Sequence, residues 1–310
     1  MYHFKKDFSP VGVVKIEQNY RSVQPILQAA NKVIGNNSNR TEKKLWSELE
    51  AKDRILNVAC KNEYQESDIT VQFTKNTIQD GKSVGILYRT HAQSRLIEEA
   101  LISNGIPYKI FGGLRFYERM EIKDLLAYLR LIHNPFDRVS FFRALNKPAR
   151  GLGEKCAEEL SGLFSENPKL NFVEIIDLAL QDSVLFSGKR AIALKELADN
   201  FRSILNKHHG DDESDLSPSE ILDKVLKFTN YKNYLRTSFE AEEATTKIQN
   251  VDELIRSVSK FEERTSKSQI DGILQVDSKN PALDDFLHEV ALVQAESKNH
   301  EGEKNPAQLM

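Results

Sequence analysis

The sequence predicts an α/β domain with a parallel sheet and crossover helices, followed by an all-α domain. In the first part of the chain, short apolar runs alternate with segments of helical period, which is the pattern of strands joined by helices that cross over a sheet. After Glu118, strand patterns almost vanish and amphipathic helices follow one another. We therefore assign residues 1–133 to the α/β domain, 134–295 to the helical domain and 296–310 to a polar linker.

Strands and helices are expected to alternate in the first domain. The run Val84–Tyr88 is almost continuously apolar, as expected for a strand that is buried on both faces. Asn104-Gly105 is a typical stop for the helix that follows it, and the polar segment 35–54 is predicted to be a loop. The expected strands are 11–16, 55–59, 84–88 and 108–111, and the expected helices are 22–36, 63–80 and 93–103.

Helices are expected to dominate the rest of the chain. The strongest, 121–133, carries Ile122, Leu125 and Leu129 at helical spacing and ends at Asn134-Pro135. Two segments, the acidic 208–217 and the polar 266–280, are predicted to be irregular. Further helices are expected at 137–146, 154–165, 171–181, 187–208, 217–229, 240–265 and 282–295.

The composition restricts the class of protein. A net charge of −3 excludes a wholly basic nucleic-acid coat, although it allows a local basic site. The two cysteines, Cys60 and Cys156, fit no zinc pattern and indicate no disulfide framework, and we expect Cys156 to lie in the core. No apolar run approaches the roughly 20 residues that a membrane span needs, and the N-terminus carries no signal-peptide pattern. We therefore expect a soluble, cytoplasmic protein with no membrane partner and no metal site.

Two short patterns resemble nucleotide-binding motifs without fitting them. Gly81-Lys82-Ser83 resembles the end of a GxxxxGK[ST] loop, but the first glycine would fall at Asn76. The order is also reversed, because a phosphate loop needs a strand before it and a helix after it. Asp252-Glu253 lies in a charged helix and not at the end of an apolar strand, so we do not interpret it as a Walker B pair.

The segment Glu17–Ser22 lies at a predicted turn from a strand to a helix, which is the edge of an open α/β sheet where ligands bind. Ser22 can cap the helix, and Pro25 is tolerated in its first turn. Arg21 can offer a bidentate fork to a phosphate, and Tyr20 can offer a flat face to a base. The same residues also fit a buried tyrosine beside a surface arginine, so the segment alone leaves both interpretations open.

Several short motifs of the sequence resemble those of a known protein family. Gln18-Asn19-Tyr20-Arg21-Ser22 resembles motif IV of the superfamily 1 DNA helicases of the UvrD/PcrA/Rep type. The resemblance covers residues 4 to about 155 with specific motifs, whereas the remainder is similar only in helical character and order. The other similar stretches are 4–10, 39–46, 84–95, 106–117 and 121–130.

The resemblance implies a fold and a set of partners. Residues 1–133 would form part of the RecA-like motor domain 2A, with the helical domain 2B inserted in it and 296–310 returning to 2A. Because the Walker loops and motifs V and VI are absent, we expect a middle piece of a longer helicase. The intact enzyme would use ATP and Mg²⁺, none of it bound by this piece alone. Its partners would be single-stranded DNA, the junction of single- and double-stranded DNA, the missing 1A and 1B motor domains, and repair or replication proteins.

The resemblance also implies a nucleotide site at motif IV. In the family, the tyrosine of this motif stacks on the adenine and the arginine reaches the γ-phosphate across the cleft between the motor domains. These roles fall on Tyr20 and Arg21, which makes Arg21 the expected catalytic residue. Gln18 belongs to the same ATP-binding motif, and we expect it to hold the turn together with Asn19.

A second candidate site follows the strand Val84–Tyr88. Small polar groups and arginines at the C-terminal end of a strand suit the phosphate backbone of a single strand. The expected contacts are Arg89, Thr90, His91 and Arg95, although the family usually has asparagine where this chain has His91. A capped loop with Arg95 on the surface is the alternative.

A third candidate site is the turn between two predicted helices, where two glycines flank Leu152. It resembles a helix–hairpin–helix, in which amides of the turn and of the next helix hold a duplex phosphate. A plain connection between helices is the alternative. The expected DNA contacts are Lys147, Arg150, Gly151, Gly153 and Lys155.

Together these motifs predict the central portion of an ATP-dependent 3′–5′ DNA helicase, which couples ATP hydrolysis to movement along single-stranded DNA and to duplex unwinding in repair or replication. The piece alone is expected to be inactive. Two alternatives stay open at this point: a helicase–nuclease subunit in the manner of AddA or RecB, and a non-catalytic module that binds DNA or a protein partner.

Overall fold

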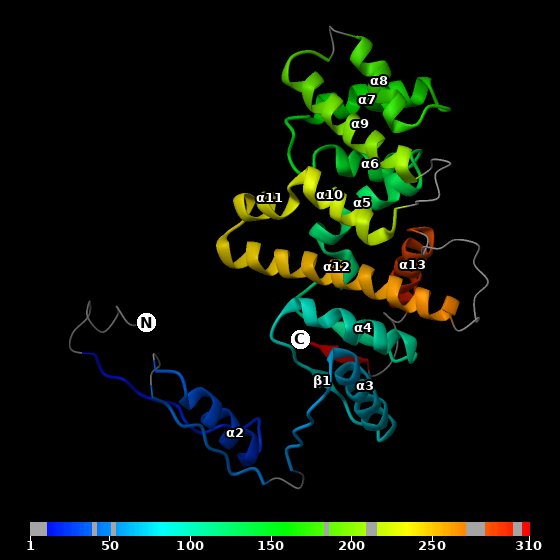
Figure 1. Ribbon diagram of the computed structural model, residues 1–310. Helices are drawn as coiled ribbons and strands as arrows, with labels where there is room; N and C mark the ends of the chain where they lie inside the picture. The colour runs from blue at the N-terminus through cyan, green and yellow to red at the C-terminus, as the bar shows by residue number, and fades with distance from the viewer. Residues whose placement is uncertain are drawn as a thin grey trace. The chain divides into compact units, whose positions relative to one another are not determined.

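The computed structural model describes residues 11–38, 42–50, 54–182, 186–208, 216–270, 283–299 and 306–310. The chain divides into two compact units, residues 1–61 and residues 62–310. Figure 1 shows both units, and we describe each of them by itself.

In the described part of the first unit, helix α2 (Gln24–Gly35) is flanked by two extended segments. The segments meet at an isolated parallel bridge between Gln18 and Trp46, where the Asn19 amide donates to the Trp46 carbonyl at 2.7 Å. The predicted strands 11–16 and 55–59 do not form. Both runs are apolar, but no described neighbour offers the ladder of hydrogen bonds that would define a strand.

Helix α2 starts one residue later than expected. Val23 is the N-cap residue and its side chain makes no capping bond, so the predicted cap by Ser22 is wrong. Pro25 lies in the first turn, as predicted. Of the apolar residues of α2, Leu27 is 4% exposed, whereas Val33 is 72% exposed.

The second unit begins with a small parallel sheet of the order β1–β3–β2. Strand β3 (Ala307–Leu309) pairs with β1 (Gly85–Ile86) on one side and with β2 (Tyr108–Ile110) on the other. The last apolar residues of the chain therefore form the central strand, although residues 111–306 separate β3 from its neighbour β2. This arrangement confirms a parallel sheet at both predicted positions, 84–88 and 108–111.

Two helices cover this sheet. Helix α3 (Glu63–Gln79) begins at Asn62, whose side chain accepts a hydrogen bond from the Gln65 amide. Helix α4 (Ser94–Ser103) connects β1 to β2 and ends at the predicted stop, where Gly105 has φ +63. The apolar faces of these elements share one small core, made of Val71, Ile86, Leu101, Ile102, Ile106, Tyr108, Ala307 and Leu309.

The Gly81 turn joins α3 to β1, with φ +74 at the glycine. A helix therefore precedes the turn and a strand follows it, which confirms that Gly81-Lys82-Ser83 is not a phosphate loop.

All described elements between Phe116 and Asn299 are helices, joined by turns and loops. Most of them match the predicted positions to within a few residues, but the short α11 was not predicted and α13 runs past residue 295. Helix α12 continues to Ile270, so the prediction of an irregular segment at 266–280 is wrong for 266–270, and 271–280 lie outside the described residues. None of the described helices is long and apolar enough to cross a membrane. The elements are η2 (Phe116–Glu118), α5 (Met120–His133), α6 (Arg138–Leu145), α7 (Glu154–Glu166), α8 (Phe172–Gln181), α9 (Lys189–His208), α10 (Pro218–Thr229), α11 (Tyr231–Ser238), α12 (Ala241–Ile270) and α13 (Leu283–Asn299).

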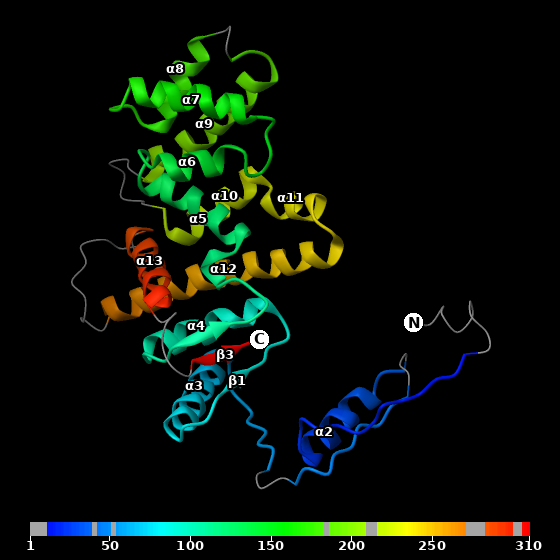
Figure 2. The ribbon, with the colours of Figure 1, turned by 180° about the vertical axis from the view of Figure 1, so that it is seen from behind.

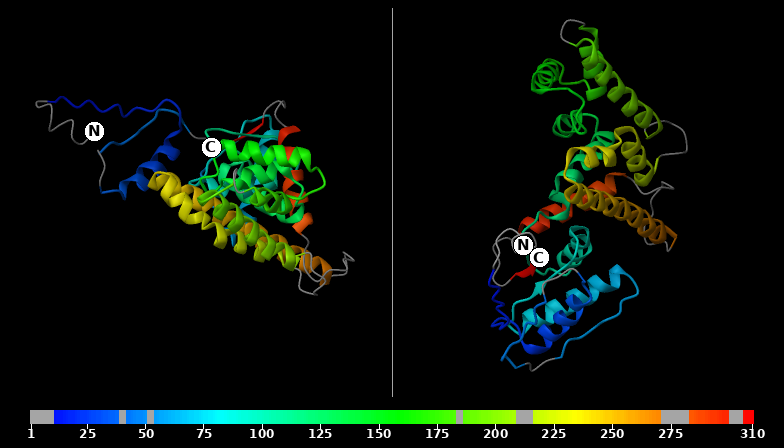
Figure 3. Two further views of the ribbon diagram at one scale, coloured as in Figure 1. Left: turned by 90° about the horizontal axis from the view of Figure 1, so that it is seen from above. Right: turned by 90° about the vertical axis from the view of Figure 1, so that its left-hand side faces the viewer.

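A second, larger core fills the helical part, with α5 at its centre. Ile122, Leu125 and Leu129 of α5 are fully buried against neighbouring helices. Leu254 and Val258 of α12 belong to the same core, as does Cys156, which was predicted to lie in the core. The long helix α12 lies between α4 on one side and α5, α10 and α11 on the other, as Figures 1, 2 and 3 show.

The aromatic cluster of this core predicts a large difference between two residues of α6. Phe141 is completely buried and its ring contacts Phe142, Phe164 and Phe172, whereas Val139 is 83% exposed. Phe141→Ala is expected to lower the free energy of unfolding by about 3–5 kcal/mol. Val139→Ala is the matched control and should change it by less than about 0.5 kcal/mol. Denaturant unfolding followed by circular dichroism measures both, and similar values for the two variants would contradict this core.

Candidate functional site

The predicted site residues lie in three separate segments of the structure. The turn with Tyr20 and Arg21 belongs to the first unit. In the second unit, residues 89–95 follow β1, and residues 147–155 connect α6 to α7. Figures 1 and 2 show α6 and α7 on the opposite side of α12 from α4, so the two segments of this unit that were predicted to bind DNA are not brought together.

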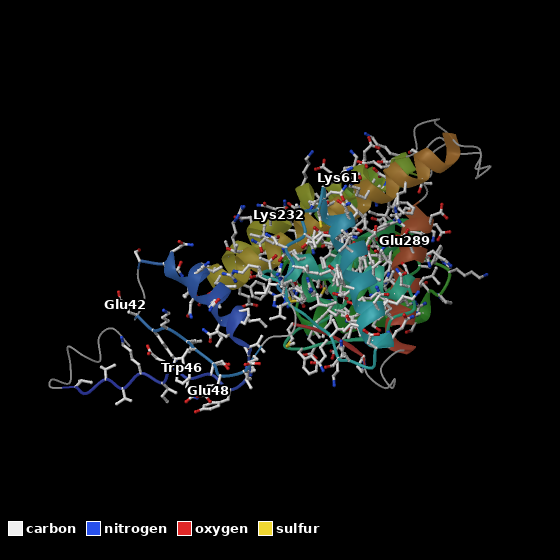
Figure 4. All side chains as sticks on the ribbon, turned by 90° about the horizontal axis from the view of Figure 1, so that it is seen from below. Glu42, Trp46, Glu48, Lys61, Lys232 and Glu289 are labelled. Atoms are coloured by element: carbon white, nitrogen blue, oxygen red, sulfur yellow. The ribbon has the colours of Figure 1, made fainter. Side chains whose placement is uncertain are left out.

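The turn in the first unit is built around Asn19. Its side-chain oxygen accepts hydrogen bonds from the Arg21 amide at 2.9 Å and from the Ser22 amide at 2.8 Å. Such a side-chain turn fixes the backbone immediately before a helix. Its base is the bridge to Trp46, which Figure 4 labels. The prediction that Asn19 holds this turn is therefore confirmed.

Tyr20 and Arg21 project from the turn toward solvent. Tyr20 is 79% exposed, and its hydroxyl donates to the Gln18 side-chain oxygen at 2.8 Å. Arg21 is also exposed, and no described carboxylate pairs with it. The alternative of a buried tyrosine is thus wrong. The turn presents a flat ring and an unpaired guanidinium side by side, which suits a ligand with an aromatic base and phosphates.

Gln93 shapes the second segment, where β1 ends. Its side-chain oxygen accepts from the backbone amides of Arg89 and Thr90, both at 3.0 Å. The backbone amide of Gln93 donates to the Thr90 carbonyl at 3.1 Å. These bonds close a tight turn before α4. The Arg89 side chain is exposed and pairs with no described carboxylate, so it can accept a phosphate from solvent.

His91 lies on the outside of the same turn. Its ring approaches Tyr88 edge-on, with 6.3 Å between centroids. Burial lowers the pKa of His91, and the nearby Arg119 lowers it further. The imidazole is therefore neutral at pH 7 and can serve a ligand as a hydrogen-bonding group, not as a charge. Gly113 lies beneath it, since an added Cβ there would come within 3.3 Å of the ring.

Arg119 anchors this turn from below. The guanidinium is 6% exposed and donates to the His91 carbonyl at 2.9 Å and to the Ser94 hydroxyl at 2.8 Å. On its other side it donates to the side-chain oxygen of Asn250 in α12 at 2.9 Å. Asn250 in turn donates to Glu121 at 2.6 Å. One buried cation thus joins the turn after β1 to the long helix.

The structure corrects the prediction for Arg95. Its side chain is not on the surface but is 3% exposed, because it points into the contact between α4 and α12. There it donates to Glu253 at 2.7 Å and to both oxygens of Glu99 at 2.7 and 2.8 Å. Because this guanidinium is buried and paired with two carboxylates, it is not accessible to a phosphate in solvent. Arg95 therefore belongs to the contact between the helices, and its predicted DNA contact is not supported.

A cleft of about 630 Å³ opens where β1 ends. Arg89, Thr90 and Gln93 line it, as do Glu253 and Arg256 of α12. Glu63 and Glu66 also belong to its lining. Because acids repel phosphate, the part that Arg89 and Thr90 line is the one suited to a nucleic-acid backbone.

Several residues that build this site could not be recognised from the sequence. Arg119, Asn250 and Glu253 are distant in the chain and meet only through the packing of α12. The spacing of polar residues on one face of α12 was a usable signal: Asn250, Glu253 and Ser257 recur at helical intervals and are all buried. Burial of polar side chains at helical spacing indicates a polar contact with another element.

The turn between α6 and α7 is built around two glycines, Gly151 and Gly153. Gly151 has φ +71, in the left-handed region that favours glycine, and Gly153 is the N-cap residue of α7. Leu152 between them is 2% exposed and pins the turn to the core. Within the described part of the chain, no acceptor takes the amides of residues 151–155. Both glycines and Lys155 are exposed, and Lys147 is partly exposed.

Arg150, in contrast, points inward beneath this turn. One of its terminal nitrogens donates to the carbonyls of Ala144 and Leu145 at 2.8 and 3.1 Å, and the other donates to the Tyr128 hydroxyl at 2.6 Å. The prediction that Arg150 offers its charge to a DNA phosphate is not supported by this orientation.

The turn after β1 rests on a buried acid, Glu98. Its carboxylate accepts from the Ser94 hydroxyl at 2.6 Å and from the Tyr108 hydroxyl at 3.3 Å. Burial raises the pKa of Glu98 to about 7, against the opposing effects of the Ser94 hydrogen bond and the Arg119 charge. Glu98 therefore titrates near neutral pH, directly behind the residues that form the cleft.

Comparison with known proteins gives a consistent family. The model of the UvrD-like helicase C-terminal domain matches residues 14–310. The chain is 36% identical to the ATP-dependent DNA helicase PcrA of Bacillus subtilis (strain 168), over 99% of this chain and 40% of that protein. It is 36% identical to the ATP-dependent DNA helicase UvrD1 of Mycobacterium bovis, over 94% of this chain and 37% of that protein. It is also 36% identical to DNA helicase II of Haemophilus influenzae, over 83% of this chain and 35% of that protein. The chain thus spans 40% or less of the length of these relatives.

Glu98 predicts a pH dependence of stability. Between its ordinary pKa of 4.5 and its native pKa of about 7, the native state holds a proton that the unfolded state has lost. The free energy of unfolding should therefore fall as the pH rises through this window, by up to about 1.4 kcal/mol per pH unit. Glu98→Gln should remove this slope, whereas the exposed Glu158→Gln should keep it. Urea unfolding at pH 5, 6, 7 and 8 measures the slope, and equal slopes for wild type and Glu98→Gln would contradict the assignment.

Proposed function

Because the chain belongs to the family of UvrD-like helicase C-terminal domains, we propose that it is part of an ATP-dependent DNA helicase. In the intact enzyme, hydrolysis of Mg-ATP drives movement along single-stranded DNA in the 3′–5′ direction and opens the duplex ahead. The names of its relatives, which are ATP-dependent DNA helicases, support this proposal. Such an enzyme serves repair or replication of DNA.

The sheet of the second unit is the RecA-like part of motor domain 2A in this proposal. Its central strand β3 returns between β1 and β2 after the whole run of helices from α5 to α13. That order supports an insertion of a helical domain, 2B, into 2A. The large core that these helices share, separate from the core of the sheet, also supports it.

The observation that carries the nucleotide site is the turn at Asn19. It holds the backbone of Arg21 in place while the guanidinium extends into solvent without a carboxylate partner among the described residues. An arginine that is positioned and unpaired can stabilise the charge that develops on a transferring γ-phosphoryl group. We therefore assign this role to Arg21, adenine stacking to Tyr20, and support of the Tyr20 ring to Gln18, whose side chain accepts the Tyr20 hydroxyl.

The single-strand contact is assigned to the turn after β1. Arg89 supplies the charge, and Thr90 supplies a hydroxyl at the rim of the cleft. His91, neutral at pH 7, adds a hydrogen-bonding group. These contacts recognise backbone and not base sequence, which suits an enzyme that must move along any strand.

The duplex contact is assigned to the turn between α6 and α7. The free amides of Gly151 and Gly153 and the first turn of α7 can hold one phosphate, with Lys147 and Lys155 adding charge. Glu154, next to Gly153, opposes this attraction, so the amides and the lysines must outweigh one carboxylate.

The ATP and Mg²⁺ of the intact enzyme must be held largely by other residues. The GxxxxGK[ST]-like sequence of this chain is the Gly81 turn, which has the wrong order of elements for a phosphate loop. We therefore expect the 310-residue chain by itself to show no DNA-stimulated ATP hydrolysis.

Arg21 gives the test of the proposed function. In the intact helicase, Arg21→Ala should lower the maximal rate of ATP hydrolysis by about 10³–10⁵, because the γ-phosphoryl group loses its arginine. The affinity for single-stranded DNA should stay near normal. Tyr20→Ala should instead raise the KM for ATP through lost stacking. DNA-stimulated ATPase kinetics and fluorescence anisotropy with a labelled single strand measure these effects.

The matched control is Arg54→Ala, which removes another exposed arginine of the same unit and should leave the kinetics unchanged. Wild-type turnover by Arg21→Ala would overturn the proposed role.

A further inference from the structure

We propose that Arg150 is a positioning residue, which shapes the turn 146–153 so that its amides can hold a duplex phosphate, and that it does not contact the phosphate itself. This inference rests on the proposed function of that turn.

The contacts of the Arg150 guanidinium are all beneath the turn. One terminal nitrogen donates to the carbonyls of Ala144 and Leu145 at the end of α6 and to the Pro148 carbonyl at 3.3 Å. These carbonyls come from both ends of the same bend. A single planar group thus ties the last turn of α6 to the loop that leaves it, and it adds a charged donor to carbonyls at the end of that helix.

Tyr128 of α5 completes the support. Its hydroxyl accepts from Arg150 at 2.6 Å and donates to the Lys147 carbonyl at 2.6 Å. The guanidinium also lies over the Tyr128 ring, with its central carbon 5.9 Å from the ring centroid. Because Tyr128 is completely buried in the large core, it gives the turn a fixed floor.

The backbone of the turn is fixed at its start as well. The amide of Arg150 donates to the side-chain oxygen of Asn146 at 2.7 Å. Asn146, Arg150 and Tyr128 therefore hold the inner side of the loop, and Leu152 is pinned in the core just beyond it. What remains on the outer side is the row of amides from Gly151 to Lys155, without acceptors among the described residues.

A residue that neutralises a phosphate and a residue that only shapes the turn have different effects on the salt dependence of binding. A lysine or arginine that neutralises a phosphate releases counterions, so its removal lowers the dependence of log affinity on log salt by about one unit. A residue that only shapes neutral amide donors changes the affinity and leaves that slope intact. A salt titration of DNA binding therefore distinguishes a residue that contacts the phosphate by its charge from one that only shapes the turn.

The experiment titrates the intact helicase with a labelled duplex–tail junction and with the bare single strand at several salt concentrations. Arg150→Lys keeps the charge but cannot donate to carbonyls and to Tyr128 at the same time, and Tyr128→Phe removes no charge at all. Both variants should weaken junction binding about tenfold, since they loosen the turn. Both should keep the wild-type salt slope and the wild-type affinity for the bare strand.

Lys155→Ala is the matched control for a charge contact, because Lys155 is exposed at the start of α7. It should lower the salt slope of junction binding by about one. If Arg150→Lys binds the junction like wild type while Arg150→Ala lowers the slope in the manner of Lys155→Ala, Arg150 contacts the phosphate directly and the inference is wrong. Unchanged junction binding by Tyr128→Phe would also overturn it.

The variant Gly153→Val distinguishes a failure of this inference from a failure of the proposed function. A Cβ at Gly153 meets nothing within 4 Å in the protein, so the chain can fold with it while a phosphate is kept away. Wild-type junction binding by Gly153→Val shows that the turn holds no phosphate, and then the proposed function of the turn fails. If Gly153→Val weakens binding, the Arg150 and Tyr128 variants decide the inference alone. ATP hydrolysis stimulated by the bare strand confirms that each variant is folded.

Discussion

The guanidinium of Arg119 is the interaction on which the arrangement of the second unit depends. It is buried where three elements meet, and it donates to the turn at His91, to Ser94 at the start of α4, and to Asn250 of α12. Without it, the carbonyl and hydroxyl of the turn would lose their buried donor, and this turn would lose its link to Asn250 of α12. The proposed single-strand contact thus rests on a buried residue behind the turn.

A buried cation of this kind is stable only because acids surround it. Glu98 is linked to it through Ser94, and Glu121 is linked to it through Asn250. Arg95 of α4 pairs with Glu99 and with Glu253 of α12, in the same contact between α4 and α12. Burying charges costs free energy, and removing one partner of such a pair typically costs more than the pair contributes. We infer that this polar contact determines which face of α12 meets α4, more than it adds to stability.

The sequence predicted what depends on local pattern. The helices α3 to α10, the stop at Gly105 and the two strands of the β1–α4–β2 unit follow from apolar spacing and turn residues, and they were found. The prediction of strands at 11–16 and 55–59 was wrong, because an apolar run becomes a strand only beside another strand with which it can form hydrogen bonds. Arg95 and Arg150 were misplaced for a related reason: an arginine among polar residues resembles a surface contact until a distant helix or a carbonyl cluster closes over it. The long-range pairing of Arg119 with Asn250 had no signal beyond the spacing of polar residues in α12.

We propose that Arg119 holds the turn after β1 in the conformation that would bind a single strand. The most direct test is the DNA-stimulated ATPase of the intact helicase carrying Arg119→Lys, measured as a function of single-strand concentration. A lysine keeps the buried charge but cannot reach His91, Ser94 and Asn250 together. We expect a higher half-saturating DNA concentration with an unchanged maximal rate. A wild-type half-saturating concentration, in a variant that is folded by circular dichroism, would contradict it.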